Sequence, residues 1–158
     1  VALVVILFGL IFCNIADCST ISHREQYLNQ LADINDVHIV SEIMIDNYII
    51  SGYVSSNRSY GIAIFEPMYR GKYKFQSNVN CSENEVLFST VIINDVFWDL
   101  IWINKLDLDF ARIVYYTDAG IKVYKLDASN NKILHVQSPA KNYDVLVNLV
   151  DNNGYCYG

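Results

Sequence analysis

The chain opens with a long run of apolar residues and then changes to an alternating pattern of apolar and polar positions. Residues 1–13 carry no charged side chain, and the run continues to Ala16 with one polar interruption. A helix rises about 1.5 Å per residue, so residues 1–16 would cover roughly 24 Å, less than the roughly 30 Å hydrocarbon core of a bilayer. This length is typical of the apolar part of a secretory signal peptide. We expect residues 1–18 to be a signal peptide or a membrane anchor rather than a buried core segment.

The end of this run is compatible with three routes of export. Ala16 and Cys18 place small residues where a signal peptidase cleaves, which predicts cleavage before Ser19. Residues 15–18 also resemble a lipoprotein box, which predicts lipidation of Cys18, although Asp17 stands where that pattern has Gly or Ala. The third route is an uncleaved anchor. We expect an extracytoplasmic domain, secreted or membrane-anchored, and leave the route open.

Beyond the leader, one short stretch has helical spacing and the rest alternates with a period of two. Ser22 and Glu25 have the spacing of a capping box, and the apolar residues that follow predict a helix over 22–33. From residue 37 onward, β-branched and aromatic residues alternate with polar ones, and turn signals arrive about every ten residues. The predicted strands are 37–45, 48–55, 60–65, 72–79, 86–93, 96–104, 111–116, 121–127, 132–137, 143–150 and 155–157.

These strands predict a mainly β domain over residues 37–158, preceded by a short helix or stalk over 19–36. About ten antiparallel strands in sequential order form a meander, which can pack as a sandwich, curve as one sheet or close as a barrel. The strand 96–104 is apolar on both faces, so we expect the hairpin 86–104 at the centre of the core. No internal repeat or low-complexity linker divides the chain, which indicates a single domain.

The net charge of the chain disfavours some classes of binding partner. The chain has 11 Lys and Arg against 17 Asp and Glu, which gives a net charge of −6. Nucleic-acid binding needs clustered cations, and the sequence has no basic run, so nucleic acid is disfavoured as a partner. An acidic domain is also repelled by an anionic membrane surface. Contact with a membrane is therefore expected through residues 1–18 alone.

Three stretches carry a resemblance to a known group of proteins. They are DNYIISGYVSSNRSYGIAIFEPMYRGKYKFQSNVN at 46–80, VFWDLIWINKLDLDFARIVYY at 96–116 and VNLVDNNG at 147–154. They resemble small, uncharacterised membrane-anchored proteins of Gram-positive bacteria, in which a β domain faces outward from an N-terminal hydrophobic segment. The resemblance implies a place at the cell envelope. It implies no activity, because it carries no catalytic motif.

Residues with catalytic or metal-binding chemistry are few. Asp107 and Asp109 lie two residues apart, so they would share one face of a strand, or hold a hard cation from a loop, with Asp99 nearby across a turn. The alternative is a solvated turn. The sequence has no zinc-ligand spacing, no nucleophile motif and no glycine-rich phosphate loop, so we expect no cofactor. The histidines that lack such spacing are His23, His38 and His135.

Cysteine and tyrosine supply the remaining candidates. Cys81 and Cys156 could form a disulfide in an exported domain, the alternative being two thiols. Tyrosine is abundant, with 12 residues, and exposed tyrosines on a sheet supply rigid contact area for binding. Most of them are expected in the core and rim of the domain. Tyr69 and Arg70 lie in a predicted turn and are the candidate interface residues.

Three functions are compatible with these patterns. The leading hypothesis is a non-enzymatic binding module at the cell envelope, for a protein, a peptide or an envelope component. The second is an envelope hydrolase or metal-dependent enzyme built on Asp99, Asp107 and Asp109. The third is a carrier of a small ligand, if the meander closes as a barrel around an apolar cavity lined by Trp98 or Trp102.

Overall fold

The computed structural model describes residues 17–31, 35–56, 59–81, 86–104, 107–130 and 132–157. These residues form one α-helix, α2 (Ile21–Leu28), a short 3-10 helix, η1 (Tyr69–Gly71), and eleven strands. The strands are β1 (His38–Ile45), β2 (Tyr48–Val54), β3 (Tyr60–Pro67), β4 (Tyr73–Cys81), β5 (Val86–Ile93), β6 (Val96–Ile103), β7 (Leu108–Thr117), β8 (Gly120–Asp127), β9 (Ile133–Gln137), β10 (Asp144–Asp151) and β11 (Cys156–Tyr157). Within this part of the chain, no helix has the length and apolarity to span a membrane. The predicted leader up to residue 16 lies outside the described residues.

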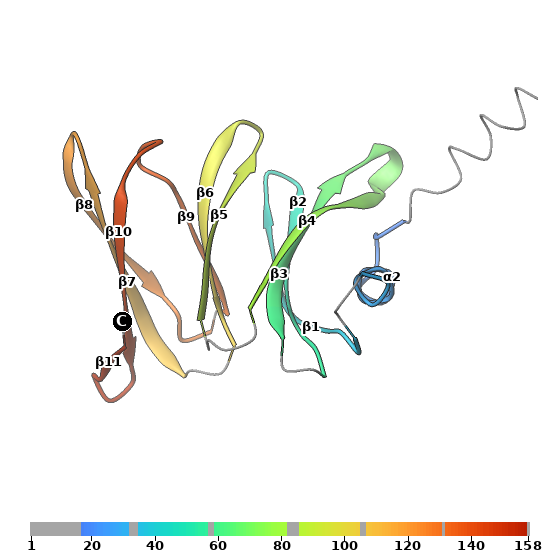
Figure 1. Cartoon of the computed structure of the whole chain (residues 1–158), viewed down its shortest axis with the longest axis horizontal. Helices are drawn as coiled ribbons and strands as arrows, with labels where there is room; N and C mark the ends of the chain where they lie inside the picture. The colour runs from blue at the N-terminus through green and yellow to red at the C-terminus, as the bar shows by residue number, and fades with distance from the viewer. Residues whose placement is uncertain are drawn as a thin grey trace, which may run out of the picture.

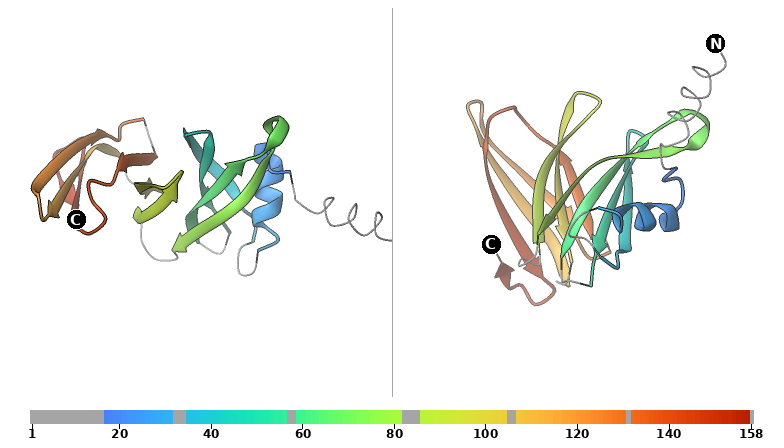
Figure 2. Two further views of the ribbon diagram at one scale, coloured as in Figure 1. Left: turned by 90° about the horizontal axis from the view of Figure 1, so that it is seen from above. Right: turned by 45° about the vertical axis from the view of Figure 1, so that its right-hand side comes forward.

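The strands form three antiparallel sheets (Figure 1). Sheet A has the order β1-β2-β3-β4, sheet B the order β5-β6-β9, and sheet C the order β11-β10-β7-β8. Seen from above in Figure 2, the sheets follow one another as layers, with sheet B in the middle and α2 on the far side of sheet A. The prediction of a mainly β, antiparallel fold is confirmed.

The arrangement of the strands is more complex than a sequential meander. Strands β1 to β4 do pair in chain order, but β9 pairs with β6 and β10 pairs with β7. The hairpin β7–β8 therefore lies in a different sheet from the strands before and after it. The described strands divide among three sheets instead of forming one curved sheet, one barrel or a two-sheet sandwich.

The apolar side chains gather between the layers. Between sheets A and B, Trp102 of β6 packs among isoleucines of β1, β2 and β3. Between sheets B and C, Ile101 and Ile103 of the same strand pack with residues of β7 and β10. Trp102 and Ile101 are both 0% exposed, because β6 is covered on both faces. The prediction that this strand lies at the centre of the core is confirmed.

Two tight turns form where the sequence predicts them. Asp46 and Asn47 join β1 to β2, and Asn94 and Asp95 join β5 to β6. All four residues have positive φ, between 46° and 68°. Two consecutive residues with positive φ are typical of the type I′ turn, whose twist matches that of the flanking strands, and Asn and Asp tolerate this conformation well.

The helix is shorter than predicted and begins earlier. The prediction was 22–33, whereas α2 is capped by Thr20, whose hydroxyl accepts the N–H of His23 at 3.2 Å. The capping box predicted a bond from the carboxylate of Glu25 back to the first turn. That carboxylate instead accepts the N–H of Ile39 at 2.8 Å, at the start of β1. A tertiary contact has replaced the local one, and the helix ends after two turns.

Helix α2 packs on the outer face of sheet A through a buried arginine. The guanidinium of Arg24 donates two hydrogen bonds to the Glu42 carboxylate, at 3.0 and 2.8 Å, and one to the backbone oxygen of Cys18 at 2.7 Å. Ser51 also donates to the Glu42 carboxylate. Phe65 lies under the guanidinium at 5.7 Å. Helix α2 is thus packed against the β domain through these contacts.

Candidate functional site

The most deeply buried acidic group of the described residues lies at the junction of sheets B and C. Asp99, on β6, is 0% exposed. Its Oδ1 accepts hydrogen bonds from the hydroxyls of Thr90 and Tyr143, both at 2.6 Å, and its Oδ2 accepts one from Tyr115 at 2.7 Å. Thr90 is the direct partner of Asp99 across the β5–β6 ladder, whereas Tyr115 comes from β7 and Tyr143 directly precedes β10. One carboxylate therefore connects two sheets.

The two phenols act as fixed hydrogen-bond donors. Burial, followed by the hydrogen bond to Asp99, raises the pKa of Tyr115 far above its ordinary value. The same two causes raise the pKa of Tyr143. A phenol with a raised pKa stays protonated at neutral pH, so both tyrosines donate to the carboxylate. The rings of Tyr115 and Tyr143 also meet edge to face, with centroids 5.1 Å apart.

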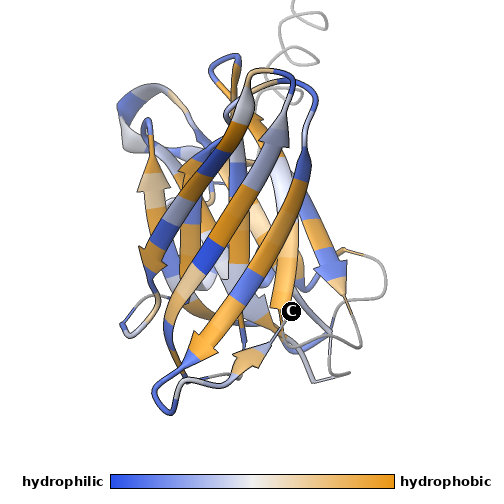
Figure 3. Ribbon diagram, turned by 90° about the vertical axis from the view of Figure 1, so that its left-hand side faces the viewer, coloured by the Kyte–Doolittle hydropathy of each residue, from blue (hydrophilic) through white to orange (hydrophobic). Residues whose placement is uncertain are grey.

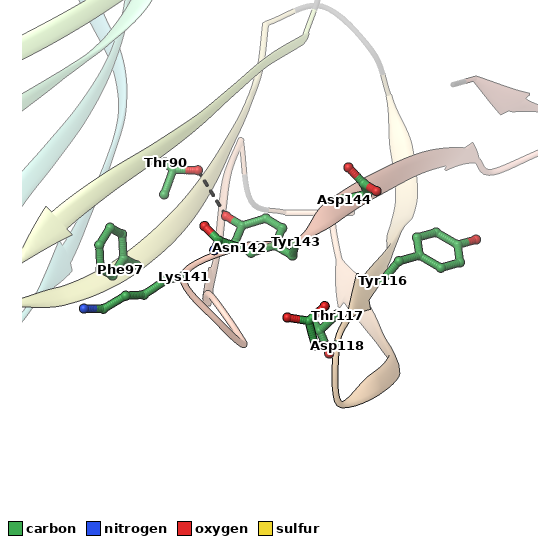
Figure 4. A pocket seen from close by; sticks show the side chains of 9 residues that line it. All are labelled: Thr90, Phe97, Tyr116, Thr117, Asp118, Lys141, Asn142, Tyr143 and Asp144. Atoms are coloured by element: carbon green, nitrogen blue, oxygen red, sulfur yellow. Dashed lines mark hydrogen bonds between the residues drawn. The ribbon is translucent and has the colours of Figure 1, made fainter.

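A cavity of about 680 Å³ lies directly beside this cluster, open to solvent at one end of sheets B and C (Figure 4). It is lined by Thr90, Phe97, Tyr116, Thr117, Asp118, Lys141, Asn142, Tyr143 and Asp144. We call this cavity the groove. Its lining comes from β5, β6, the end of β7 with the turn after it, and the start of β10 with the segment before it. Thr90 and Tyr143 belong both to the groove and to the Asp99 cluster, so the cluster fixes part of the groove wall.

The groove offers mainly polar groups to a ligand. Figure 4 shows Phe97 and Lys141 on one side of the open space and Thr117 and Asp118 on the other. Asn142 lies between them, next to Tyr143, and provides both a donor and an acceptor. The ammonium of Lys141 and the carboxylate of Asp118 are exposed. This arrangement can bind a polar molecule from several directions.

The ionisable side chains of the groove lining are two carboxylates, one ammonium and two phenols, those of Asp118, Asp144, Lys141, Tyr116 and Tyr143. The lining contains no Ser, Cys or His. The carboxylate that is hydrogen-bonded to Tyr143, that of Asp99, is covered by its three donors. Among the described residues, no group of three His, Cys, Asp or Glu side chains is arranged to hold a metal ion.

The structure does not bring the three predicted carboxylates together. Asp107 directly precedes β7, and Asp109 is the second residue of that strand; both are exposed. Asp99 contacts Tyr115, near the other end of β7. A strand rises about 3.3 Å per residue, which puts Asp107 roughly 26 Å from Tyr115 along β7. Asp107 instead lies beside the turn after β10, where the Asp151 carboxylate accepts the N–H groups of the turn.

The candidate interface residues are exposed, as expected for a turn. Tyr69 is 82% exposed, and the guanidinium of Arg70 lies over its ring at 5.3 Å. They form η1, at the tip of the β3–β4 hairpin. Figure 1 shows this tip at the same end of the molecule as the β5–β6 and β7–β8 turns. The pair does not line the groove, which lies between the other two sheets.

The three cysteines in the part of the chain that the structure describes occupy separate places. Cys81 ends β4 in sheet A and Cys156 lies on β11 in sheet C, so sheet B separates them and no disulfide joins them in this structure. Cys18 is 0% exposed beneath α2, and its backbone N–H donates to the oxygen of Tyr73 at 2.8 Å. Burial raises the pKa of the Cys18 thiol. Lipidation of Cys18 would require this residue to leave the core.

Comparison with models of protein families, with curated proteins and with solved structures found no match to this chain. The site must therefore be interpreted from its own chemistry. Sequence patterns did not indicate Thr90, Tyr115 and Tyr143 as partners of Asp99, because they come from separate strands. A signal was present, since Asp99 is a lone charged residue within an otherwise apolar strand, and a buried carboxylate requires donors.

Proposed function

We propose that this chain is an exported, non-enzymatic binding module and that the groove between sheets B and C is its ligand site. The observation that carries the proposal is the Asp99 cluster, which fixes the hydroxyls of Thr90 and Tyr143 on the groove wall. A site whose groups are already held in place loses little conformational entropy on binding. Anchoring by side chains from two sheets provides such a rigid site.

The chemistry of the groove favours a hydroxyl-rich ligand, and we propose an oligosaccharide of the cell envelope. Sugar hydroxyls both donate and accept hydrogen bonds. The amide of Asn142 can both donate and accept hydrogen bonds, the carboxylate of Asp118 accepts them, and the ammonium of Lys141 donates them. The half-buried ring of Phe97 offers an apolar surface to the C–H face of a sugar ring. A peptide would instead be expected to add to an exposed sheet edge or to fill apolar pockets.

Export rests on the leader at residues 1–18 and on the resemblance of the β domain to outward-facing envelope proteins. Two features support a binding function over catalysis at this location. The lining lacks a nucleophile–base pair, and the buried carboxylate is occupied by its own donors. The location is testable by treating intact cells with protease, which would degrade the β domain only if it faces outward.

The binding proposal is tested by titrating the purified protein with soluble oligosaccharide fragments of bacterial cell wall, followed by NMR or calorimetry. We expect a saturable interaction that weakens about five-fold in Asn142→Ala and in Asp118→Asn, because a lost hydrogen bond is worth about 1 kcal/mol. Asp107→Asn is the matched control, since Asp107 is an exposed carboxylate at the opposite end of β7. Absence of binding, or equal weakening by the control, would contradict the proposal.

A further inference from the structure

Strand β9 is an outer strand of sheet B, and it pairs with β6 on one side. At its two ends, the backbone oxygen of Lys132 accepts the N–H of Ile103 at 2.8 Å. The N–H of Ser138 donates to the oxygen of Phe97 at 2.9 Å. In an antiparallel ladder the bonded positions recur at every second residue, so the odd-numbered residues of β9 direct their N–H and C=O groups away from β6. These residues are Ile133, His135 and Gln137.

We call the outward backbone groups of these three residues the β9 edge. Within the part of the chain that the structure describes, no strand pairs with β9 on this side and no other group is hydrogen-bonded to the edge. The strand is nevertheless held firmly, because Ile133 packs between sheets A and B, and Leu134 and Val136 pack between sheets B and C. The edge is therefore a rigid row of unpaired backbone donors and acceptors, which is a template for a further strand.

A cavity of about 290 Å³ lies against the β9 edge. Its lining comes from one residue of β1, three of β9 and three of β8, which are Ile43, Ile133, Leu134, His135, Lys125, Leu126 and Asp127. Strands of sheets A and C therefore flank the edge on its two sides. The side chains of an added strand would alternate between these two sides. They would meet Ile43 on one side and Leu126 on the other, both half-buried and apolar.

The outer strand β8 of sheet C is protected against such pairing, whereas β9 is not. Figure 3 shows sheet C in front, with hydrophilic residues between the hydrophobic ones along its strands. In β8 these include Lys122 and Lys125, and lysine on an outer strand is a usual protection against pairing with another chain. Strand β9 has the sequence ILHVQ and contains no Lys, Arg, Asp, Glu or Pro.

We propose that the β9 edge binds an extended peptide segment of a partner protein, which adds to sheet B as a fourth strand. Alternating N–H and C=O groups on one line are matched by the backbone of an extended peptide. The apolar flanks select an uncharged, apolar segment about as long as the five residues of β9. A second copy of the chain fits less well, because its own β9 is flanked by β1 and β8, which would meet those of the first copy. The site is separate from the groove, since no residue lines both cavities.

Amide hydrogen exchange of the full chain tests this site. The probe is a peptide selected against the chain from a displayed library of random heptapeptides. In the free chain, the amides of His135 and Gln137 should exchange faster than those of Leu134 and Val136, which are bonded to β6. The selected peptide should be rich in apolar, β-branched residues and should slow exchange at His135 and Gln137 about ten-fold or more.

Three results of this experiment would overturn the proposal. The first is that no peptide is selected. The second is a selected peptide that leaves exchange at His135 and Gln137 unchanged. The third is slow exchange at these two amides in the free chain that becomes fast on dilution, which would assign the edge to a second copy.

A proline substitution then tests the role of the backbone. His135→Pro removes an N–H that points outward, so it leaves the ladder with β6 complete and is compatible with an outer strand. It is expected to weaken peptide binding about ten-fold or more, because a donor is lost and the ring obstructs the incoming strand. His135→Ala is the matched control, since it keeps the N–H and should bind within about two-fold of the unchanged chain.

Equal weakening by His135→Pro and His135→Ala would overturn the backbone pairing. Circular dichroism checks that both variants fold. If His135→Pro does not fold, Gln137→Pro with Gln137→Ala as its control repeats the comparison at the next outward N–H. The exchange measurement needs no substitution, so it decides the proposal in either case.

Discussion

At the scale of single residues, Asp99 combines complete burial with an acidic side chain, which is unfavourable unless the carboxylate has hydrogen-bond partners. A carboxylate that is removed from water without partners costs several kcal/mol. Three hydroxyl donors offset this cost through charge-assisted hydrogen bonds, which are stronger than neutral ones. Because Tyr115 belongs to sheet C and Thr90 to sheet B, the same bonds also fix how the two sheets face each other.

Removal of one donor should measure the contribution of this cluster. Tyr115→Phe retains the ring but leaves one oxygen of the buried Asp99 carboxylate without its donor, so we expect a loss of about 1–3 kcal/mol in the free energy of unfolding. Chemical denaturation followed by circular dichroism measures this loss. Tyr124→Phe is the control, because the ring of Tyr124 packs edge-on against Tyr115 outside the hydrogen bonds to Asp99. Equal losses of unfolding free energy in both variants would show that the hydrogen bond from Tyr115 to Asp99 makes no specific contribution to stability.

At the scale of elements, α2 is held to sheet A by an ion pair as well as by apolar contacts. The helix has only two turns and is too short to be stable alone. Leu28 is its buried apolar residue, and Arg24 is its buried polar one. Two nitrogens of the Arg24 guanidinium match the two oxygens of the Glu42 carboxylate. This geometry strengthens the contact and also fixes the position of the helix. The helix also covers Cys18, so the thiol reports whether the helix is in place.

Disruption of this ion pair should release the helix. Arg24→Ala leaves the partly buried Glu42 carboxylate without its cation and with Ser51 as a donor, which is expected to cost about 3 kcal/mol. The rate at which a maleimide labels Cys18 should rise accordingly, because labelling requires α2 to detach. His23→Ala, on the exposed side of the same helix, should label at the rate of the unchanged protein. Unchanged labelling in Arg24→Ala would mean that apolar contacts alone hold the helix.

At the scale of the whole molecule, the sequence predicted the strands far better than their partners. The period of two and the turn residues Asn94 and Asp95 are local features, so each predicted strand overlaps a strand of the structure. The central position of β6 was also predictable, because both its faces are apolar. The pairing of strands that are distant in sequence is not a local feature. Strand β9 pairs with β6 in sheet B, although the β7–β8 hairpin between them in the sequence lies in sheet C. The alternating pattern of β9 carries no signal of that partner.

The candidate site was predictable only in part for the same reason. The sequence analysis named Asp99 as a companion of Asp107 and Asp109, whereas the structure places it beside Tyr115. Strand β7 carries them away from Asp99 and brings Tyr115 toward it. Residues that are close in sequence, such as those at the start of a strand and in the hairpin before it, need not be close in the structure. The fold brings together residues that lie at the same level along the strands of neighbouring sheets. The groove is formed in this way, because its lining comes from four segments between Thr90 and Asp144.

Two buried phenols should report on the whole fold at high pH. Tyr53 lies in the core between α2 and sheet A, and Tyr115 lies between sheets B and C. Burial raises the pKa of both above the ordinary 10.0; the hydrogen bond from Asn78 opposes the effect at Tyr53, and Asp99 reinforces it at Tyr115. The folded chain therefore holds these protons more tightly than the unfolded chain. This contribution to stability is complete below about pH 10 and is lost as pH rises above it.

We therefore expect the free energy of unfolding to fall as pH rises above 10. The tyrosinate absorbance of Tyr53 and Tyr115 should appear together with the loss of the circular dichroism signal, because each phenol must leave its layer before it ionises. Tyr53→Phe and Tyr115→Phe should each make the fall with pH less steep, since each removes one linked proton. A fall of unchanged steepness in both variants would assign the alkaline unfolding to other groups. If only one variant changes it, the layer that contains that tyrosine opens first, and the three-sheet stack does not unfold as one unit.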